Sequence, residues 1–413
     1  MGELSFCLVT TFYPPHSFGG DAVHVHRLAT GLSQRGHRVR VVYAQAAFRL
    51  LSGDVPPAAG FDDADGVEVV SVVDAPWQAA ATYLVGGPVG YRSRLARLLD
   101  GFDVVHFHNP SLVGAARGLE LGGGLKLYTT HEHWLLCPTH VLFRYRREVC
   151  TRRTCWRCTL KHGRPPQLWR STSLLDSSVA TLDLLLSPSR FTAALHRERF
   201  RRPRVEVLAL PGPTAAQLAD LPEVPSELPS AFFLYAGRLE PIKGVQRLPA
   251  IAGRVEDAQF VVVGSGSLEG ALRDAATRLP NLHVIGAQPY PTVLALCRRA
   301  LAVIIPSIGY ETFGGVGVEA MATGTPVAVR DLGPLPELVD DGGGWTFRDD
   351  AELATLLEDL WHDDSLAVAE GKTARAIYER RWTEDRFFDR YLQLIADAAR
   401  VRGDHDLARR ARV

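Results

Sequence analysis

Short apolar runs alternate with amphipathic segments along most of this chain. The runs lie at 4–10, 39–42, 67–70, 104–107, 125–128 and 184–186, and they resume at 232–234, 260–263, 283–286, 301–305 and 327–329. Between the first two runs, Val25, Leu28 and Leu32 have the spacing of one face of a helix. Such alternation of strand and helix is typical of a parallel sheet covered by helices. The pattern therefore predicts an α/β fold with doubly wound parallel sheets.

The length of the chain indicates two lobes. It has 413 residues, 46% hydrophobic and 22% charged, and a single hydrophobic core rarely grows that large. Pro and Gly accumulate at 210–213 and 220–225, and strand-like sequence resumes at Phe232, so we place the linker between the lobes there. After Trp382 an amphipathic helical pattern continues to Ile395.

The charge balance and the ends of the chain limit the expected partners. The formal net charge is +0, so no global field attracts nucleic acid or an anionic membrane. The N-terminus enters a strand-like pattern without a basic leader, and the roughly 18 uninterrupted apolar residues of a membrane span occur nowhere. We therefore expect a cytoplasmic protein with no nucleic-acid partner and no stable membrane insertion.

The segment 310–326 carries the most informative chemistry. Gly314 and Gly315 lack Cβ atoms, so a ligand can approach the backbone, and N–H groups at the start of a helix can point at phosphate oxygens. Glu319, about one turn into that helix, can accept hydrogen bonds from two ribose hydroxyls. We expect Glu311, before the turn, to lie nearer to the transferable sugar. Two solvated glutamates on an exposed helix are the alternative.

Two cations lie in the loop after the run at 232–234. Lys243, one of only four lysines in the chain, follows Arg238 by five residues. A guanidinium and an ammonium at this spacing can hold a diphosphate, and an ordinary surface pair is the alternative. After the next run, Gly264 and Gly266 permit a phosphate to approach, although a tight turn alone also explains such a pair.

Four of the six cysteines lie in one basic insertion at about 134–165, namely Cys137, Cys150, Cys155 and Cys158. Four thiolates can close a tetrahedral structural Zn²⁺ site, and the last two have Cys-x-x-Cys spacing. His133, His140 or His162 can replace a thiolate, and disulfides or unlinked thiols are the alternatives. The insertion also holds eight cations, which suit an anionic acceptor or a solvated loop.

Taken in order, these motifs resemble those of a known family. The motifs are Gly237-Arg238-Leu239 with Lys243-Gly244, Gly264-Ser265-Gly266, Pro306-Ser307, and the run from Glu311 to Val327. Together they resemble the retaining glycosyltransferases of family four, which are group 1 glycosyl transferases of GT-B architecture. Tyr13-Pro14-Pro15, Gly19-Gly20, His24 and the segment 35–39 look like the opening signature of the same family. The resemblance covers nearly the whole chain.

The resemblance implies a GT-B fold, in which two Rossmann-like lobes face a central cleft. It implies an acceptor-binding N-terminal domain at 1–210, which includes the Cys-rich insertion, and a donor-binding C-terminal domain at 211–382. A C-terminal helix within 383–413 would return to the N-terminal domain.

The resemblance also implies roles for individual residues. Arg238 and Lys243 would hold the donor diphosphate, Glu311 would contact the sugar, and His131 would lie near that sugar, so these four are the candidate catalytic residues. The candidate donor-binding residues are Gly19, Gly20, Gly264, Gly266, Phe313, Gly314, Gly315, Val316 and Glu319.

The chemistry of sugar transfer fits these residues. Cleavage of the bond between an anomeric carbon and a phosphate leaves negative charge on the diphosphate, which two fixed cations and a helix N-terminus stabilise. Because these charges are present and no Asp-x-Asp pair stands in a matching place, we expect transfer without a catalytic metal. We identify no convincing carboxylate nucleophile for a covalent intermediate. The resemblance therefore favours a front-face mechanism, in which the leaving phosphate accepts the proton of the acceptor hydroxyl.

The sequence thus predicts a retaining transferase that uses a nucleotide sugar, with UDP as the default nucleotide. Its acceptor is a hydroxyl of a small metabolite, a lipid-linked intermediate or a saccharide. The alternatives are a sugar-nucleotide epimerase of the same two-lobed fold, and a non-catalytic sugar-nucleotide-binding assembly protein that is stapled by zinc.

Overall fold

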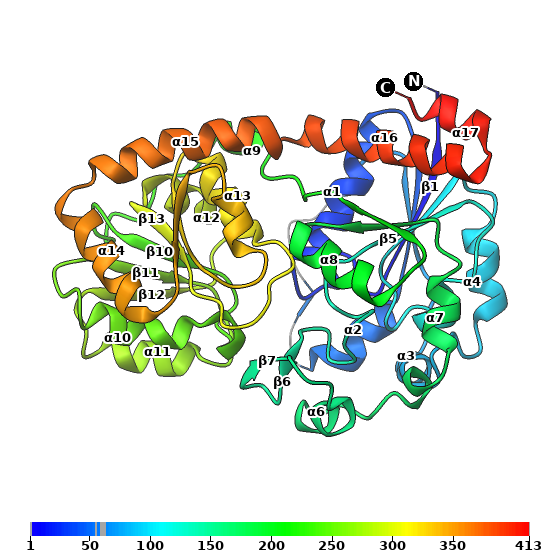
Figure 1. Ribbon diagram of the computed structural model, residues 1–413, viewed down its shortest axis with the longest axis horizontal. Coiled ribbons are helices and arrows are strands. Elements are labelled where there is room, and N and C mark those ends of the chain that lie inside the picture. Colours follow the sequence, from blue (N-terminus) through cyan, green and yellow to red (C-terminus); the bar gives the residue numbers. More distant parts are fainter. Residues whose placement is uncertain (1, 54–55, 58–62, 413) are drawn as a thin grey trace. The chain divides into compact units, whose positions relative to one another are not determined.

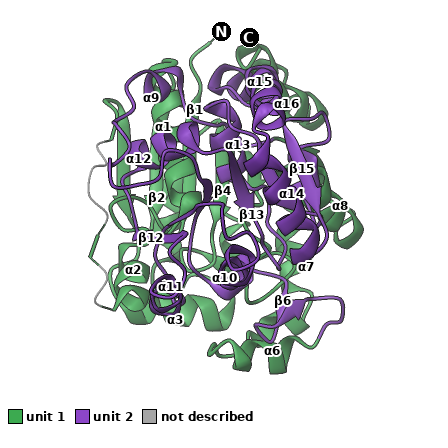
Figure 2. Ribbon diagram, turned by 90° about the vertical axis from the view of Figure 1, so that its left-hand side faces the viewer, with its two compact units in different colours: residues 1–140, 154–208, 389–413 green, residues 141–153, 209–388 purple. Residues whose placement is uncertain are grey.

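The computed structural model describes residues 2–53, 56–57 and 63–412. Its internal contacts divide the chain into two units, coloured green and purple in Figure 2. Unit 1 consists of Met1–His140, Thr154–Leu208 and Asp389–Val413, and unit 2 consists of Val141–Arg153 and Ala209–Phe388. Part of the Cys-rich insertion, which we expected within the first domain, therefore belongs to unit 2.

Unit 1 is built on a seven-stranded sheet with the order β3-β2-β1-β4-β5-β8-β9. Two of these strands, β1 and β5, are labelled in Figure 1. The strands are β1 (Ser5–Thr10), β2 (Arg38–Tyr43), β3 (Val67–Ser71), β4 (Val104–Asn109), β5 (Leu125–Thr129), β8 (Leu184–Ser187) and β9 (Arg204–Val207). Every pairing is parallel. The strand β4 is buried along its whole length, as is typical of a parallel strand covered on both faces.

The helices of unit 1 follow the apolar spacing of the sequence. They are α1 (Gly20–Gln34), α2 (Gln45–Ser52), α3 (Pro76–Val85), α4 (Arg92–Leu99), α5 (Ala115–Gly118), α6 (Cys155–Lys161), α7 (Leu174–Val179), α8 (Arg190–Arg199) and α17 (His405–Arg410), with a 3-10 turn η1 (Leu168–Ser171). The helix α16 (Glu384–Arg402) starts in unit 2 and continues into unit 1. In α1 the predicted stripe of Val25, Leu28 and Leu32 is buried.

Unit 2 contains a six-stranded parallel sheet with the order β12-β11-β10-β13-β14-β15. The strands are β10 (Phe233–Ala236), β11 (Phe260–Val263), β12 (Leu282–Gly286), β13 (Ala302–Ile305), β14 (Val327–Arg330) and β15 (Gly344–Phe347). Alternate residues of β10 belong to two separate hydrophobic clusters, Phe233 and Tyr235 to one and Leu234 to the other. Both faces of this sheet are therefore covered.

The remaining elements of unit 2 are helices and one hairpin. The helices are α9 (Ala215–Ala219), α10 (Leu248–Ala252), α11 (Glu269–Ala276), α12 (Tyr290–Arg299), α13 (Gly315–Ala322), α14 (Asp350–His362) and α15 (Ser365–Arg381), with 3-10 turns η2 (Pro241–Lys243), η3 (Val245–Arg247) and η4 (Leu335–Leu338). The hairpin comprises β6 (Phe143–Arg144) and β7 (Glu148–Val149). Among the described residues, no helix combines the length and the apolar content needed to cross a membrane.

Each sheet reverses its strand order at one place. The order reverses between β1 and β4 in unit 1 and between β10 and β13 in unit 2, because the chain first winds toward one edge and then toward the other. Ligands of doubly wound sheets bind beyond the carboxyl ends of the strands at such a switch point. The predicted α/β fold with two doubly wound sheets is confirmed, and the two switch points are where functional residues are expected.

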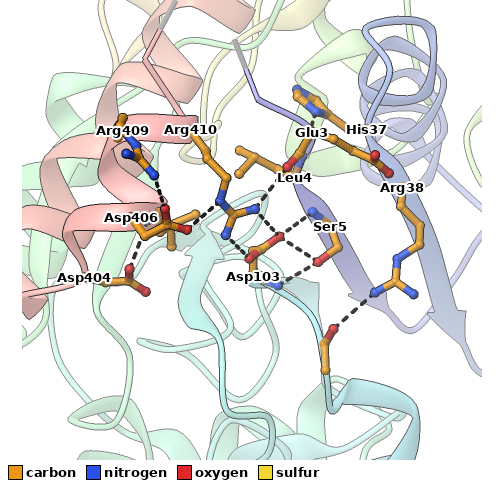
Figure 3. A network of polar contacts seen from close by, with 12 residues as sticks. Glu3, Leu4, Ser5, His37, Arg38, Asp103, Asp404, Asp406, Arg409 and Arg410 are labelled. Carbon is orange, nitrogen blue, oxygen red and sulfur yellow. Dashed lines mark hydrogen bonds and ion pairs between the residues drawn. The ribbon is translucent and has the colours of Figure 1, made fainter.

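The C-terminal helix α17 is fixed to unit 1 by an ion pair (Figure 3). Arg410 Nη2 lies 2.5 Å from Asp103 Oδ1, and Arg410 Nη1 also donates to the carbonyl of Glu3 at 3.0 Å. The amide and the hydroxyl of Ser5 each donate to Asp103 Oδ2 at 2.8 Å. Partial burial alone would raise the pKa of Asp103, but the bonds from Arg410 and Ser5 hold this pKa below its ordinary value.

Helix α16 is joined to unit 1 at two further points. The hydroxyl of Tyr391 lies 2.9 Å from Nδ1 of His106 on β4, and Arg402 donates to the carbonyls of Gly123 and Gly124 at 2.9 and 2.6 Å. The last residues of the chain are therefore an integral part of unit 1.

Removal of the Asp103 charge should destabilise unit 1 at neutral pH. The folded pKa of Asp103 lies below its unfolded value, so the ion pair contributes stability above about pH 4, and this contribution is lost as the pH falls through the folded pKa. We expect Asp103→Asn to lower the stability of β1 and α17 by about 1.5–3 kcal/mol at pH 7. Hydrogen exchange of their amides measures this difference, which should shrink in acid.

The matched control is Asp74→Asn. Its partner is Arg94, and the two side chains are 69% and 42% exposed, so this substitution should cost about 0–1 kcal/mol. An equal effect of the two substitutions would contradict the importance of the Asp103 contact.

Candidate active site

The loops that follow β10 and β11 are packed backbone against backbone. The amide of Gly237 donates to the carbonyl of Val263 at 3.0 Å, and the amide of Leu239 donates to the carbonyl of Ser265 at 2.9 Å. A Cβ atom on Gly264 would lie 1.9 Å from the Gly237 carbonyl oxygen, so no other residue fits there. Gly264, which we predicted to admit a phosphate, therefore allows two loops to pack closely together. This contact fixes the segment that carries Arg238.

The loop after β13 joins the same assembly. The amide of Ile308 donates to the carbonyl of Ile242 in η2 at 2.9 Å. On the other side, the buried guanidinium of Arg330 donates to the carbonyls of Pro306 and Arg348 at 3.3 and 2.9 Å. The carboxyl ends of β10 and β13, which meet at the switch point of unit 2, are therefore held together by main-chain contacts.

Lys243 and Glu311 form the central ion pair of this assembly. Lys243 Nζ lies 2.7 and 2.8 Å from the two Glu311 carboxylate oxygens, and Ser307 Oγ donates to Oε1 at 2.6 Å. Burial alone would raise the pKa of Glu311. The charge of Lys243 and the hydrogen bonds from Lys243 and Ser307 outweigh this effect, so the pKa lies below its ordinary value. Glu311 is therefore an anion at neutral pH.

Arg238 has the opposite surroundings. The residue is exposed, and within the described part of the chain its guanidinium has no hydrogen bond or ion pair. Its carbonyl accepts a hydrogen bond from the Tyr235 hydroxyl at 2.7 Å, which orders the main chain but leaves the side chain available. Of the two predicted cations, Lys243 is thus held by Glu311, and Arg238 is accessible to an anion from solvent.

The start of α13 presents bare backbone. Gly314 has a φ of 100°, a left-handed conformation that favours glycine, and it precedes the first helical residue, Gly315. A Cβ atom on Gly315 would meet nothing within 4 Å, so the fold itself does not require a glycine there. Phe313 is buried against Trp382, with ring centroids 6.4 Å apart. Glu319 lies one turn into α13, as predicted, and is half-buried.

The hairpin β6–β7 also reaches this region of unit 2. The Cβ position of Gly309 lies 2.4 Å from Ile242 Cγ1 and 3.2 Å from Phe143 Cδ2. Phe143 is 4% exposed, so it serves as an apolar anchor of the hairpin. Part of the insertion therefore supports the loop that precedes Glu311.

The switch point of unit 1 holds a group of histidines around His131. Nε2 of His131 lies 2.9 Å from Nδ1 of His108 at the end of β4, and the ring centroid of His24 on α1 lies 4.9 Å from that of His131. Burial lowers the pKa of His131 to about 4, so its imidazole is neutral at neutral pH. Gly19 and Gly20 are exposed at the start of α1, and a Cβ atom on Gly20 would meet nothing within 4 Å.

The four clustered cysteines differ in their surroundings. Cys137 and Cys158 are buried, Cys150 is half-buried and Cys155 is exposed. Cys155 and Cys158 are one turn apart in α6, and Cys137 Sγ lies 3.2 Å from Thr139 Oγ1. Structural zinc stays a prediction.

Within unit 2, the structure brings together Lys243 and Glu311. From the sequence, Lys243 was expected at the diphosphate and Glu311 beside the sugar. Gly264 and Gly266 pack against the Arg238 loop, and Gly314 and Gly315 open α13. Within unit 1, Gly19, Gly20 and His131 lie at the switch point. The sequence patterns predicted no role for Ser307 or His108. The pattern His106-x-His108 at the end of an apolar run was the available signal for His108.

Comparison with known families shows that each half of the chain matches a family of glycosyltransferases. Residues 18–211 match Glycosyltransferase Family 4, and residues 231–363 match Glycosyl transferases group 1. The second match covers β10 and β13 at the switch point of unit 2, and the first covers α1 and β4 at the switch point of unit 1 but begins after β1. The chain belongs to the group 1 glycosyltransferases of GT-B fold, as the motifs indicated.

Proteins similar to this chain include several glycosyltransferases. An uncharacterized glycosyltransferase of Methanocaldococcus jannaschii is 26% identical over 83% of this chain and 85% of that protein. The phosphatidyl-myo-inositol mannosyltransferase of Mycolicibacterium smegmatis is 28% identical over 88% of this chain and 86% of its own. Among solved structures, sucrose-phosphate synthase of Thermosynechococcus elongatus has a TM-score of 0.68 at 17% identity, over 96% of this chain and 100% of that one.

A second solved structure contains a nucleotide. HepE of Anabaena in complex with UDP has a TM-score of 0.63 at 17% identity, over 95% of this chain and 100% of that one. At these identities, the structural likeness establishes the GT-B fold.

Substitution of Gly315 tests whether a ligand approaches the bare backbone. Because the added methyl group meets no protein atom, Gly315→Ala should fold and unfold like the wild type. We expect the dissociation constant of a nucleoside diphosphate, measured by calorimetry, to rise about tenfold, or ~1.4 kcal/mol. Unchanged affinity would exclude a close approach of the ligand to this residue.

Proposed function

We propose that this enzyme transfers a sugar from a nucleotide-diphosphate sugar to a hydroxyl acceptor with retention of the anomeric configuration. The observation that carries the proposal is the arrangement at the switch point of unit 2. An accessible guanidinium, a partly buried ion pair and the open start of α13 follow β10 and β13 there. This combination provides for both products of the cleavage, an anionic diphosphate and an electron-poor sugar.

Arg238 is the first contact for the diphosphate. It is exposed and forms no ion pair with the described residues, so no such pair has to be broken when it binds a phosphate oxygen. The amides at the start of α13 supply neutral donors to the same anion. Binding of the donor should therefore depend more on Arg238 than on Lys243.

Lys243 acts in the transition state. Its ammonium lies within hydrogen-bond distance of both Glu311 carboxylate oxygens, so Glu311 largely neutralises its charge. As the bond to the leaving group breaks, negative charge grows on the diphosphate, and a preoriented ammonium stabilises that charge without reorganisation. Glu311 holds the ammonium in place and accepts hydrogen bonds from the sugar.

The proposed transfer follows a front-face mechanism. The bond between the anomeric carbon and the phosphate oxygen breaks, and its electron pair leaves with the nucleoside diphosphate. The acceptor oxygen bonds to the same face of the anomeric carbon, and its proton passes to the leaving phosphate oxygen. His131, neutral at neutral pH, keeps the role of hydrogen-bonding the donor sugar. Because protein cations stabilise the leaving group, the mechanism requires no catalytic metal.

UDP is the proposed nucleotide, and the names of similar proteins support two choices. HepE was crystallised with UDP, whereas a Corynebacterium glutamicum protein that is 29% identical over 40% of this chain is named as GDP-mannose-dependent. For the acceptor, the Mycolicibacterium smegmatis relative is named for phosphatidyl-myo-inositol. We propose a hydroxyl-bearing metabolite, lipid-linked intermediate or saccharide.

Thermal unfolding with UDP, GDP or dTDP should identify the nucleotide. A ligand that binds only the folded protein stabilises it by about 2.7 kcal/mol at 100 times its dissociation constant. We expect the largest rise in the unfolding temperature with UDP. The rise should be lost in Arg238→Ala and kept in Arg254→Ala, an exposed arginine without an assigned role.

A transfer assay tests the chemistry. Lys243→Ala and Glu311→Ala should each lower kcat by about 100-fold or more, because each removes a preorganised charge, and Lys372→Ala and Glu358→Ala are the exposed controls. Arg238→Ala should chiefly raise the KM of the donor. Activity should persist in EDTA, and NMR of the product should show the anomeric configuration of the donor.

The same assay separates the alternatives. Formation of an epimer without an acceptor would establish the epimerase. Nucleotide binding without turnover, across a panel of acceptors, would establish a non-catalytic binding protein. Undiminished turnover of Lys243→Ala would refute the assigned site.

A further inference from the structure

Three imidazoles from three separate elements converge at the switch point of unit 1. His24 lies on α1, His108 at the end of β4, and His131 in the loop after β5. One ring nitrogen from each residue lies within 4.8 Å of one from each of the others. His24 is 7% exposed and His108 is fully buried, whereas His131 is partly accessible. The group is therefore a preformed cluster with access from solvent beside His131.

The spacing of the rings is close to that around a metal ion. With a metal–nitrogen distance of about 2.1 Å, each ring centroid lies about 3.2 Å from the metal, and tetrahedral ligands have centroids about 5.2 Å apart. The observed separations are 4.9 Å for His24 and His131, 5.2 Å for His108 and His131, and 6.1 Å for His24 and His108. The first two separations lie within about 0.3 Å of the tetrahedral value, and the third is longer.

A fourth histidine, His106, lies near the cluster on β4 and serves as a comparison, because both of its ring nitrogens are hydrogen-bonded. His106 uses both nitrogens, with Tyr391 Oη at 2.9 Å and Thr129 Oγ1 at 2.8 Å. His108 differs, because its buried Nε2 has no hydrogen-bond partner among the described residues. Its Nδ1 faces Nε2 of His131 at 2.9 Å, and only one of these two nitrogens can carry the shared proton. His108 therefore offers a buried ring nitrogen that no hydrogen bond among the described residues uses.

The electrostatic surroundings also suit a cation. The negative charge of Asp21 acts on His131, and Asn109 Nδ2 fixes its carboxylate at 3.3 Å. Arg27 opposes this effect at His24. A divalent ion would thus bring positive charge next to a carboxylate.

We propose that His24, His108 and His131 form a binding site for a divalent transition-metal ion, with Zn²⁺ as the best fit. Nitrogen ligands and three-coordinate protein geometry with room for a fourth ligand are typical of zinc. The metal here is an inhibitor. When it is bound, it occupies one ring nitrogen of His131 and holds the imidazole that would otherwise hydrogen-bond the sugar. The inhibition rests on the proposed function, whereas the binding of metal does not.

Titration with Co²⁺ tests the site by its own spectrum. The protein carries Cys155→Ser and Cys158→Ser, which removes the Cys-x-x-Cys pair, and it is stripped with EDTA before the titration. We expect one equivalent of Co²⁺ to give visible d–d absorption without sulfur-to-cobalt charge transfer, and Zn²⁺ to displace it. His24→Gln should weaken Co²⁺ binding by at least about tenfold.

The control is His196→Gln on α8. His196 is equally buried, and its Nδ1 lies 2.7 Å from the carbonyl of Thr192, but it stands apart from the cluster. The His196→Gln substitution should leave Co²⁺ binding unchanged, and circular dichroism should show that the His24→Gln and His196→Gln variants are both folded. Equal Co²⁺ affinity of the two variants, or a spectrum dominated by sulfur, would overturn the proposal.

Activity provides a separate measurement. Zn²⁺ should inhibit sugar transfer, and the inhibition constant should rise at least about tenfold in His24→Gln but stay unchanged in His196→Gln. Co²⁺ binding in a protein without transferase activity would refute the proposed function and keep the metal site. Transferase activity without Co²⁺ binding would refute only the metal site.

Discussion

The contact on which the proposed active site depends is the close approach of two backbone loops in unit 2. The loop after β11 can lie against the loop after β10 only because Gly264 has no side chain. Two main-chain hydrogen bonds, from Gly237 and Leu239, then fix the loop that carries Arg238. Main chain moves less freely than long side chains. The loop therefore gives the side chains of Arg238 and Lys243 a fixed point of attachment. Mutations here would displace the cations without touching a ligand.

The two switch points share a topology and differ in their electrostatics. In unit 2, the charge of Lys243 keeps Glu311 ionised although the carboxylate is largely buried. In unit 1, burial keeps His24, His108 and His131 neutral, and at His131 the negative charge of Asp21 does not offset the loss of hydration. The same kind of sheet therefore supports an ionic site in one unit and a site of neutral imidazoles in the other.

The fold could be predicted from the sequence because buried parallel strands are continuous apolar runs, as in β10, β11 and β13. The strands β9 and β15 were missed because they carry charged residues or glycine and are only partly buried. Motif spacing located Lys243 and Glu311, but their pairing could not be predicted. The two residues are 68 positions apart, and their contact depends on which strands are neighbours in the sheet. The histidine cluster was missed for the same reason, since α1 and β4 meet only in the folded unit.

The chain passes between the two units four times, after His140, Arg153, Leu208 and Phe388. Ribosomal synthesis therefore delivers the whole of unit 2 before the last 25 residues of unit 1, Asp389–Val413. Arg410 therefore reaches Asp103, and Tyr391 reaches His106, only after unit 2 has been synthesised. The chain therefore begins with unit 1 but completes unit 2 first. For the same reason, dividing the gene at a single point yields neither unit intact.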